Sequence, residues 1–201
     1  MAMILRSAVA SPFVRKVRIC ADVLGLIGKI ELKPVNNTDP ADPIIQQNPL
    51  GKIPALVLED GRVLYDSSVI VEYLDWLAGG GVIPREPMAR FEALTQAALA
   101  DGILEAAILI IYEGRYRPDQ PPHQGWLDFQ RGKIERALAV LRAKPPALSA
   151  VTVGTIAVAC ALGYLDFRKQ VDWRAKYPAL IAWLDEFRLK VPAYDRTRPE
   201  G

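Results

Sequence analysis

Hydrophobic positions in the first part of the chain follow two different spacings. The segments at residues 3–7 and 29–35 have the short apolar or alternating pattern of strands. Between them, apolar residues recur every third or fourth position from Pro12 to about Gly25, and this spacing predicts a helix with one buried face. The first elements are therefore predicted as strand, helix, strand.

Residues 53–66 contain two apolar runs on either side of Asp60-Gly61, which is typical of a β-hairpin. Another amphipathic helix is predicted to start near Asp66-Ser67. A polar, proline-containing loop separates the second strand from this hairpin. The predicted order of the first half is therefore β-α-β, a loop, and then β-β-α.

Everything after residue 87 has helical periodicity. The predicted helices cover about 88–116, 127–141, a run without charge at 147–165, and 180–187. The Gly- and Pro-rich segment 79–87 interrupts the pattern and is predicted to be a linker. We therefore expect an α/β domain at 1–78 and an all-helical domain at 88–201.

The run at 147–165 is about as long as a membrane span, but it contains several polar or small residues in its first half. Thr152 is expected to be an N-cap, so that the helix itself begins inside the run. A buried helix of a helical domain fits this pattern better than a membrane helix.

The composition limits the function classes. Hydrophobic residues make up 51% of the 201 residues and charged residues 24%, and the net charge is +2. This balance argues against a nucleic acid or an anionic membrane as the main partner. Cys20 and Cys160 are far apart in predicted helices and are expected to be core residues, not a disulfide. Because the start also lacks a signal-peptide pattern, we expect a cytoplasmic protein.

Elimination narrows the chemistry further. His123 is the only histidine, so that a Ser-His-Asp or Cys-His arrangement is close to excluded. One histidine and two separate cysteines do not make an ordinary zinc site, and no metal is expected. There is also no phosphate-binding loop.

Three segments of the first half have features that suit an anionic, peptide-like ligand. Ser11 precedes Pro12 and is predicted to be the N-cap of the first helix, where the helix dipole favours negative charge. Asp66-Ser67 opens another helix, whose free N–H groups suit a carboxylate. Ile53-Pro54 opens a strand, and a cis bond there would turn the polar backbone groups of Ile53 towards a ligand. Each feature taken alone has a purely structural explanation.

The motifs SPFVRKVRI, NPLGKIPAL and YDSSVIVEYL, in this order and spacing, resemble those of the glutathione transferase superfamily, and TVGTIAVACALGYL agrees in the helical half. The resemblance is to bacterial, zeta- and omega-like members. It implies a thioredoxin-like fold for the α/β domain, detoxification chemistry with glutathione as cosubstrate, and a cis Pro54. Ile53 would pair with the cysteinyl part of glutathione, Asp66 and Ser67 would hold its γ-glutamyl end, and Lys52 would reach its glycyl carboxylate.

Ser11 matches the position of the catalytic serine or cysteine in such enzymes. Its hydroxyl would donate a hydrogen bond to the glutathione sulfur, and the helix end would favour the nucleophilic thiolate. Ser7 is a weaker candidate, because it ends a strand and no proline follows it.

The helical half would supply the remaining site residues. Phe13, Tyr112 and Tyr116 are candidates for the electrophile pocket, whereas Ile108 has the spacing of a core residue. The resemblance also implies a homodimer in which Asp101 reaches the glutathione of the partner subunit.

One departure concerns the uncharged helix. Family members often have Asp three residues after the N-cap of this helix, and Thr155 stands there instead. We therefore expect a weakened capping box at Thr152.

The leading hypothesis is a glutathione transferase acting on small hydrophobic electrophiles. The alternatives are a non-catalytic protein of the same fold that binds glutathione or a partner, and a glutathione-dependent thiol reductase or isomerase. Serine at position 11 disfavours the reductase, because a serine cannot form a mixed disulfide.

Overall fold

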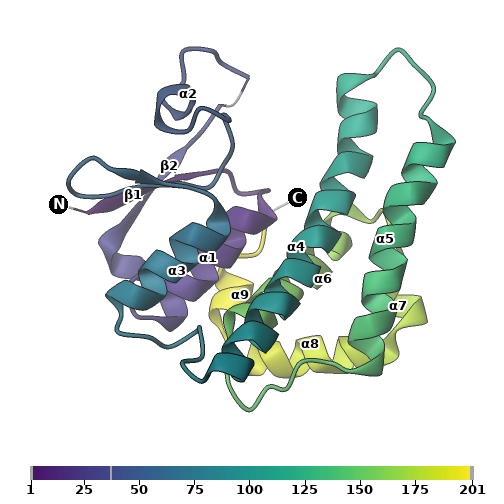
Figure 1. The fold of residues 1–201 in the computed structure, drawn as a ribbon. Helices are drawn as coiled ribbons and strands as arrows, with labels where there is room; N and C mark the ends of the chain where they lie inside the picture. Colours follow the sequence, from purple (N-terminus) through teal and green to yellow (C-terminus); the bar gives the residue numbers. More distant parts are fainter. Residues whose placement is uncertain (1, 37, 200–201) are drawn as a thin grey trace. The chain divides into compact units, whose positions relative to one another are not determined.

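The computed structural model describes residues 2–36 and 38–199, and its first unit is built on a mixed sheet (Figure 1). The four strands lie in the order β2-β1-β3-β4. β1 pairs with β2 in parallel, whereas β1–β3 and β3–β4 are antiparallel. The strands are β1 (Met3–Ser7), β2 (Ile30–Pro34), β3 (Ala55–Val57) and β4 (Val63–Leu64).

Helices connect and cover these strands in the predicted order β-α-β, loop, β-β-α. They are α1 (Pro12–Val23), the 3-10 helix η1 (Ile27–Lys29), α2 (Ile44–Gln47), α3 (Ser67–Leu77) and α9 (Ala193–Arg196). The hairpin between β3 and β4 turns at Gly61, whose φ of 85° is a conformation that glycine adopts without steric cost. The predicted fold of this half is confirmed.

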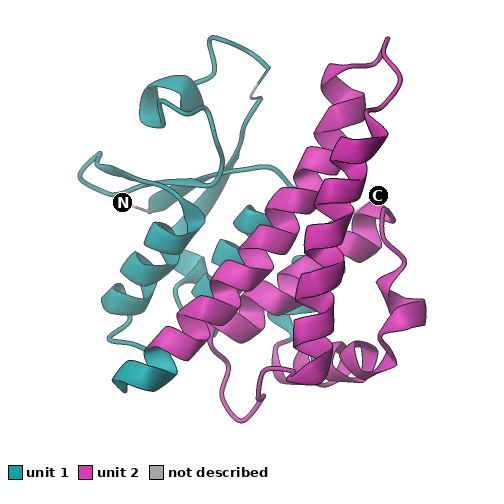
Figure 2. Cartoon of the chain, turned by 45° about the vertical axis from the view of Figure 1, so that its right-hand side comes forward, with its two compact units in different colours: residues 1–90, 192–201 teal, residues 91–191 magenta. Residues whose placement is uncertain are grey.

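The second unit is helical, as predicted. It contains most of α4 (Pro87–Tyr116) together with α5 (Gln124–Ala143), α6 (Val153–Arg168), α7 (Trp173–Lys176) and α8 (Pro178–Lys190). The chain divides into its two compact units within α4, after Arg90 (Figure 2).

The C-terminal segment from Pro192 belongs to the first unit and not to the helical one. Arg15 of α1 is buried and donates hydrogen bonds to the Tyr194 carbonyl at 2.7 Å and to Thr197 Oγ1 at 3.4 Å. Its guanidinium carbon also lies 4.0 Å from the centre of the Tyr194 ring. These contacts hold α9 to α1. The segment from Pro192 was expected to belong to the helical domain at 88–201, but it groups with the first unit instead.

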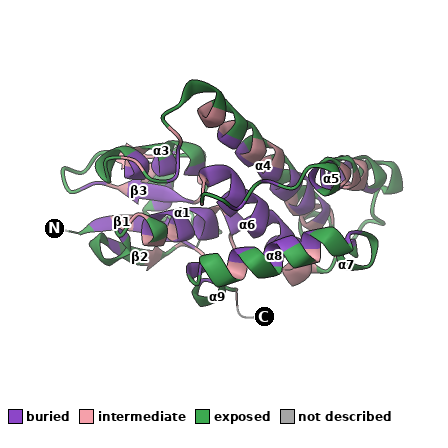
Figure 3. Cartoon of the chain, turned by 90° about the horizontal axis from the view of Figure 1, so that it is seen from below, coloured by how far each residue is buried: buried purple, intermediate pink, exposed green. Residues whose placement is uncertain are grey.

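The expected buried helix is α6, and every residue from Val153 to Leu165 is buried (Figure 3). This confirms the core interpretation of the uncharged run. Among the described residues one helix, α4, is long and apolar enough to cross a membrane, a test that core helices of soluble proteins also pass.

The expectation of a weakened capping box on α6 is wrong. The Thr155 backbone N–H donates to Thr152 Oγ1 at 3.3 Å, and the Thr152 backbone N–H donates to Thr155 Oγ1 at 2.9 Å. A threonine hydroxyl accepts the hydrogen bond that a carboxylate accepts in the acidic version, because the box needs only an oxygen at this position. The box is therefore complete without a charge.

Candidate functional site

Strand pairing brings the three candidate segments to one end of the sheet. Ala55, the first residue of β3, lies opposite Arg6 near the end of β1. β4 ends at Leu64, which lies opposite Leu56 of β3. The chain therefore leaves β1 towards Ser11, enters β3 from Pro54 and leaves β4 towards Asp66 at the same sheet end.

Ser11 is the N-cap of α1, as predicted. Its Oγ accepts a hydrogen bond from the Val14 backbone N–H at 3.3 Å, and its carbonyl accepts the first helical bond from Arg15 at 3.1 Å. Within the described part of the chain, the hydroxyl itself donates to no protein group. Its proton therefore remains available for a ligand.

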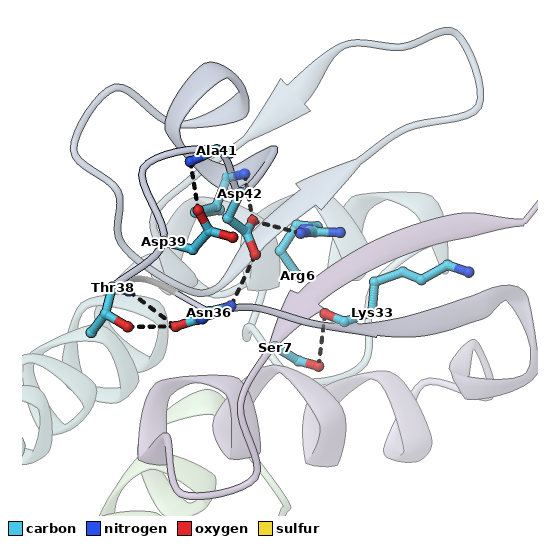
Figure 4. Close-up of polar contacts among 9 residues, drawn as sticks. Arg6, Ser7, Lys33, Asn36, Thr38, Asp39, Ala41 and Asp42 are labelled. Carbon is cyan, nitrogen blue, oxygen red and sulfur yellow. Dashed lines mark hydrogen bonds and ion pairs between the residues drawn. The ribbon is translucent and has the colours of Figure 1, made fainter.

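Ser7, the competing hydroxyl, is engaged elsewhere. It is buried, and its Oγ donates to the Lys33 carbonyl at 3.3 Å (Figure 4). Ser7 thus fastens β1 to β2, and its local environment explains why a serine stands there.

The first turn of α1 contains no acidic residue. Burial lowers the pKa of Arg18 further along the same helix, and the neighbouring charge of Arg15 lowers it in addition. The half-buried Phe13 ring lies 5.7 Å from Lys16 Nζ. The start of α1 has the positive end of the helix dipole and no carboxylate in its first turn, and both features favour a negative charge beside Ser11.

The loop before β3 is held by one buried side chain, that of Asn48. Its Nδ2 donates to the Lys52 carbonyl at 2.8 Å, and its Oδ1 accepts from the Leu50 N–H at 3.1 Å. Gly51 between them has a φ of 61°, in the left-handed region that favours glycine. Asn48 thereby fixes the backbone that leads into Ile53, while the Lys52 side chain is exposed.

The Ile53–Pro54 bond is cis, as expected from the family resemblance. Pro54 is buried and Ile53 is partly exposed. Asn48 and Gly51 belong to this segment too, and sequence reasoning did not single them out as supports of the site.

Asp66 and Ser67 form the start of α3, as predicted. Asp66 is the N-cap, and its carboxylate accepts from the Ser68 N–H at 2.8 Å. Ser67 is 3% exposed, and among the described residues its side chain has no hydrogen-bond partner. A small hydroxyl and the first N–H groups of a helix thus stand beside an exposed carboxylate.

Behind this sheet end, Arg6 and Asp42 form an ion pair that the sequence did not indicate (Figure 4). An Arg6 guanidinium nitrogen lies 2.8 Å from Asp42 Oδ1. The Asp42 carboxylate also accepts from the backbone N–H groups of Ile44 and Asn36. These two backbone bonds and then Arg6 hold the pKa of Asp42 below its usual value. The pair fastens the loop around Asp42 to β1.

The candidate pocket residues of the second unit lie near the end of α4. The rings of Tyr112 and Tyr116 make an edge-to-face contact with their centres 5.1 Å apart. Tyr112 is partly exposed, Tyr116 is 62% exposed, and Asp101 is partly exposed further back on the same helix. Ile108 is also only partly buried.

The described residues contain no group of three or more His, Cys, Asp or Glu side chains that could hold a metal ion. Cys20 and Cys160 are both buried, as predicted for core residues.

A mixed sheet of four strands with its covering helices, followed by a helical unit, matches the fold of glutathione S-transferases. The glutathione S-transferase N-terminal domain matches residues 5–81, and the C-terminal domain matches residues 124–186. The chain belongs to the glutathione S-transferase family.

Relatives match over the full length of the chain. The chain is 34% identical to the uncharacterised GST-like protein YibF of Escherichia coli (strain K12), with 98% of each covered. It is similar to a glutathione transferase family member of Pseudomonas fluorescens Pf-5 solved with bound glutathione, with a TM-score of 0.92, 45% identity and full coverage of both chains. A second structure described as a family member from Pf-5, with bound S-(propanoic acid)-glutathione, is also 45% identical, with a TM-score of 0.88 and 99% and 100% coverage.

Proposed function

We propose that the protein is a glutathione transferase in which Ser11 activates the thiol of glutathione for attack on an electrophile. The observation that carries the proposal is the state of the Ser11 hydroxyl. Its oxygen accepts the capping bond from Val14, while its proton is not donated to any described protein group. A thiolate is a good acceptor for such a proton, and the adjoining helix end stabilises its negative charge.

Glutathione itself would be held by the segments at the same sheet end. Ile53 would offer its backbone to the cysteinyl part, and Asp66 and Ser67 would hold the γ-glutamyl end. Lys52, whose side chain is exposed, would meet the glycyl carboxylate. Similar structures of 45% identity with bound glutathione and with an S-substituted glutathione support this assignment.

Phe13, Tyr112 and Tyr116 would supply apolar surface for the electrophile. Aromatic side chains of this kind make up much of the lining of small-molecule sites. With a haloarene, the thiolate sulfur would form the new bond to the ring carbon and halide would leave with its bonding pair. With an unsaturated carbonyl compound, the sulfur would add to the C=C bond, whose electron pair would take up a proton from solvent.

The experiment is a turnover panel. Purified protein and glutathione are incubated with haloarenes, with unsaturated carbonyl compounds and with small disulfides, while calorimetry measures glutathione binding. Conjugation with binding supports the proposal. Binding without turnover would instead indicate the binding protein, and reduction of disulfides alone would indicate the reductase.

We also propose a cytoplasmic homodimer in which Asp101 reaches the glutathione amine of the partner subunit. Sedimentation at micromolar concentration tests the assembly. A monomer at that concentration would contradict both the dimer and this role of Asp101.

A further inference from the structure

Aromatic and arginine side chains gather on α4 and α6 of the second unit. We call this group the aromatic–arginine cluster; it consists of Tyr112, Arg115, Tyr116, Tyr164, Phe167 and Arg168.

The α4 part of the cluster combines the Tyr112–Tyr116 ring pair with one cation. The guanidinium carbon of Arg115 lies 5.6 Å from the centre of the Tyr112 ring. Arg115 and Tyr116 are both exposed. A cation and an open aromatic surface thus lie side by side on one face of the helix end.

The α6 part has the same combination. The guanidinium carbon of Arg168 lies 4.5 Å from the Phe167 ring centre and 5.4 Å from that of Tyr164. Arg168 Nε also donates to the Tyr164 hydroxyl oxygen at 3.3 Å. These contacts pre-position the planar guanidinium, which lowers the entropy lost when it binds a ligand.

The α4 part and the α6 part of the cluster both act on the pKa of Tyr164. Burial raises the pKa of Tyr164, and the hydrogen bond and charge of Arg168 oppose this rise. On α4, Tyr112 raises the pKa of Tyr164 and Arg115 lowers it. Tyr164 is 4% exposed, and an arginine of α4 and an arginine of α6 both lower its pKa.

Neither arginine of the cluster has a carboxylate partner among the described residues. The acids nearest in sequence are engaged by other cations: Glu113 pairs with Arg117 at 2.8 Å, and Asp166 pairs with Arg174 at 2.7 Å. Two guanidinium groups held by aromatic rings thus keep their positive charge without a counterion. A guanidinium recognises a carboxylate through two parallel hydrogen bonds, and open aromatic rings stack on planar groups.

We infer that the aromatic–arginine cluster selects electrophiles that carry a carboxylate on an aromatic or conjugated planar framework. Arg115 and Arg168 would bind the carboxylate, and Tyr112 and Tyr116 would contact the planar part. This inference rests on the proposed function and narrows its substrate class from hydrophobic electrophiles in general to acidic ones.

A suitable probe reaction is the conjugation of 4-chloro-3-nitrobenzoate. The glutathione thiol first gives its proton to solvent, and the thiolate sulfur forms a bond to the ring carbon that carries chlorine. Chloride then leaves with the electron pair of the C–Cl bond. The carboxylate takes no part in these bonds, so that its effect on the rate reports recognition alone.

The first test compares this probe with the neutral 4-chloro-3-nitrobenzamide, each rate being divided by its uncatalysed rate. The wild type should prefer the acid in kcat/KM by about tenfold or more, the effect of one charge-assisted hydrogen bond. Arg115→Gln and Arg168→Gln should remove this preference and leave the amide rate within about twofold. Arg168→Lys keeps the charge and should retain part of the preference. Arg117→Gln is the matched control and should change neither rate.

A second test needs no turnover. Calorimetry measures the binding of glutathione, S-benzylglutathione and S-(4-carboxybenzyl)glutathione to the wild type and the Arg115→Gln variant. The inference predicts that the carboxylate strengthens binding to the wild type about tenfold and gives no advantage in the variant.

The outcomes separate the two proposals. Equal binding of the two conjugates, with glutathione still bound, would overturn the acidic substrate class and leave the transferase proposal standing. Tighter binding of the carboxylated conjugate without any conjugation would support the cluster's role and contradict the transferase. If neither glutathione nor its conjugates bind, both proposals fail.

Discussion

Asn48 holds the loop that leads into Ile53, and its replacement tests whether the segment that we propose to bind glutathione must be held rigid. The side chain is 1% exposed and makes two hydrogen bonds, from Nδ2 to the Lys52 carbonyl and from the Leu50 N–H to Oδ1. Asn48→Ala removes both. At about 0.5–1.5 kcal/mol for each bond, the free energy of unfolding should fall by about 1–3 kcal/mol.

The effect on ligand binding follows from the position of the loop. Without the Asn48 side chain, the backbone at Leu50 and Lys52 loses the two hydrogen bonds that hold it in place before Ile53. Glutathione would then have to order this loop on binding. Its apparent affinity should fall in proportion to the fraction of molecules in which the loop is already ordered. If that fraction is one-tenth, the affinity should fall about tenfold.

Urea unfolding and calorimetry with glutathione measure the two effects. Asn36→Ala is the matched control, because Asn36 is an exposed loop asparagine whose side chain, among the described residues, accepts bonds from Thr38 alone. It should change affinity little. Unchanged stability and unchanged glutathione affinity in Asn48→Ala would refute the reasoning.

Three further predictions concern other parts of the fold and site. Thr155→Val should lower the free energy of unfolding by about 1–2 kcal/mol in urea, because it removes half of the capping box, and Thr155→Ser should not. The lowered pKa of Asp42 gives stability that is present above its ordinary value of 3.8 and is lost as the pH falls through the folded-state pKa. The stability difference between wild type and Asp42→Asn should therefore shrink in urea titrations run at progressively lower pH, and a constant difference would contradict the assignment. Ser67→Ala should weaken glutathione binding by about tenfold without unfolding the protein, and an unchanged calorimetric affinity would remove Ser67 from the γ-glutamyl site.

Local signals explain how much of this fold the sequence could predict. Three segments formed as expected because the signal lies within the segment itself. These are the helix cap at Ser11-Pro12, the hairpin turn at Asp60-Gly61 and the buried helix in the uncharged run at 147–165. The short helices α2, α7 and α9 have four residues each, too few for a helical period to be visible.

Long-range contacts could not be predicted from the sequence, for a different reason. The hydrogen bond from Arg15 to the Tyr194 carbonyl joins residues that are 179 positions apart, and the local sequence around either residue does not indicate it. The Arg6–Asp42 pair likewise depends on where the folded chain places the loop around Asp42 beside β1. In the candidate site, the capping residues were visible in the sequence, whereas the support given by Asn48 required the folded loop.

The role of Ser11 is the central claim, and the pH dependence of glutathione conjugation by wild type and Ser11→Gly tests it most directly. Glycine is a tolerated N-cap, so that the variant should lose only a few tenths of a kcal/mol of stability. Without the hydroxyl the thiolate loses a donor, and the pKa of bound glutathione should rise. We predict an acidic limb shifted to higher pH and a lower rate, with glutathione affinity little changed. Coinciding profiles and rates would show that Ser11 is only a cap and that the helix end alone activates the thiol.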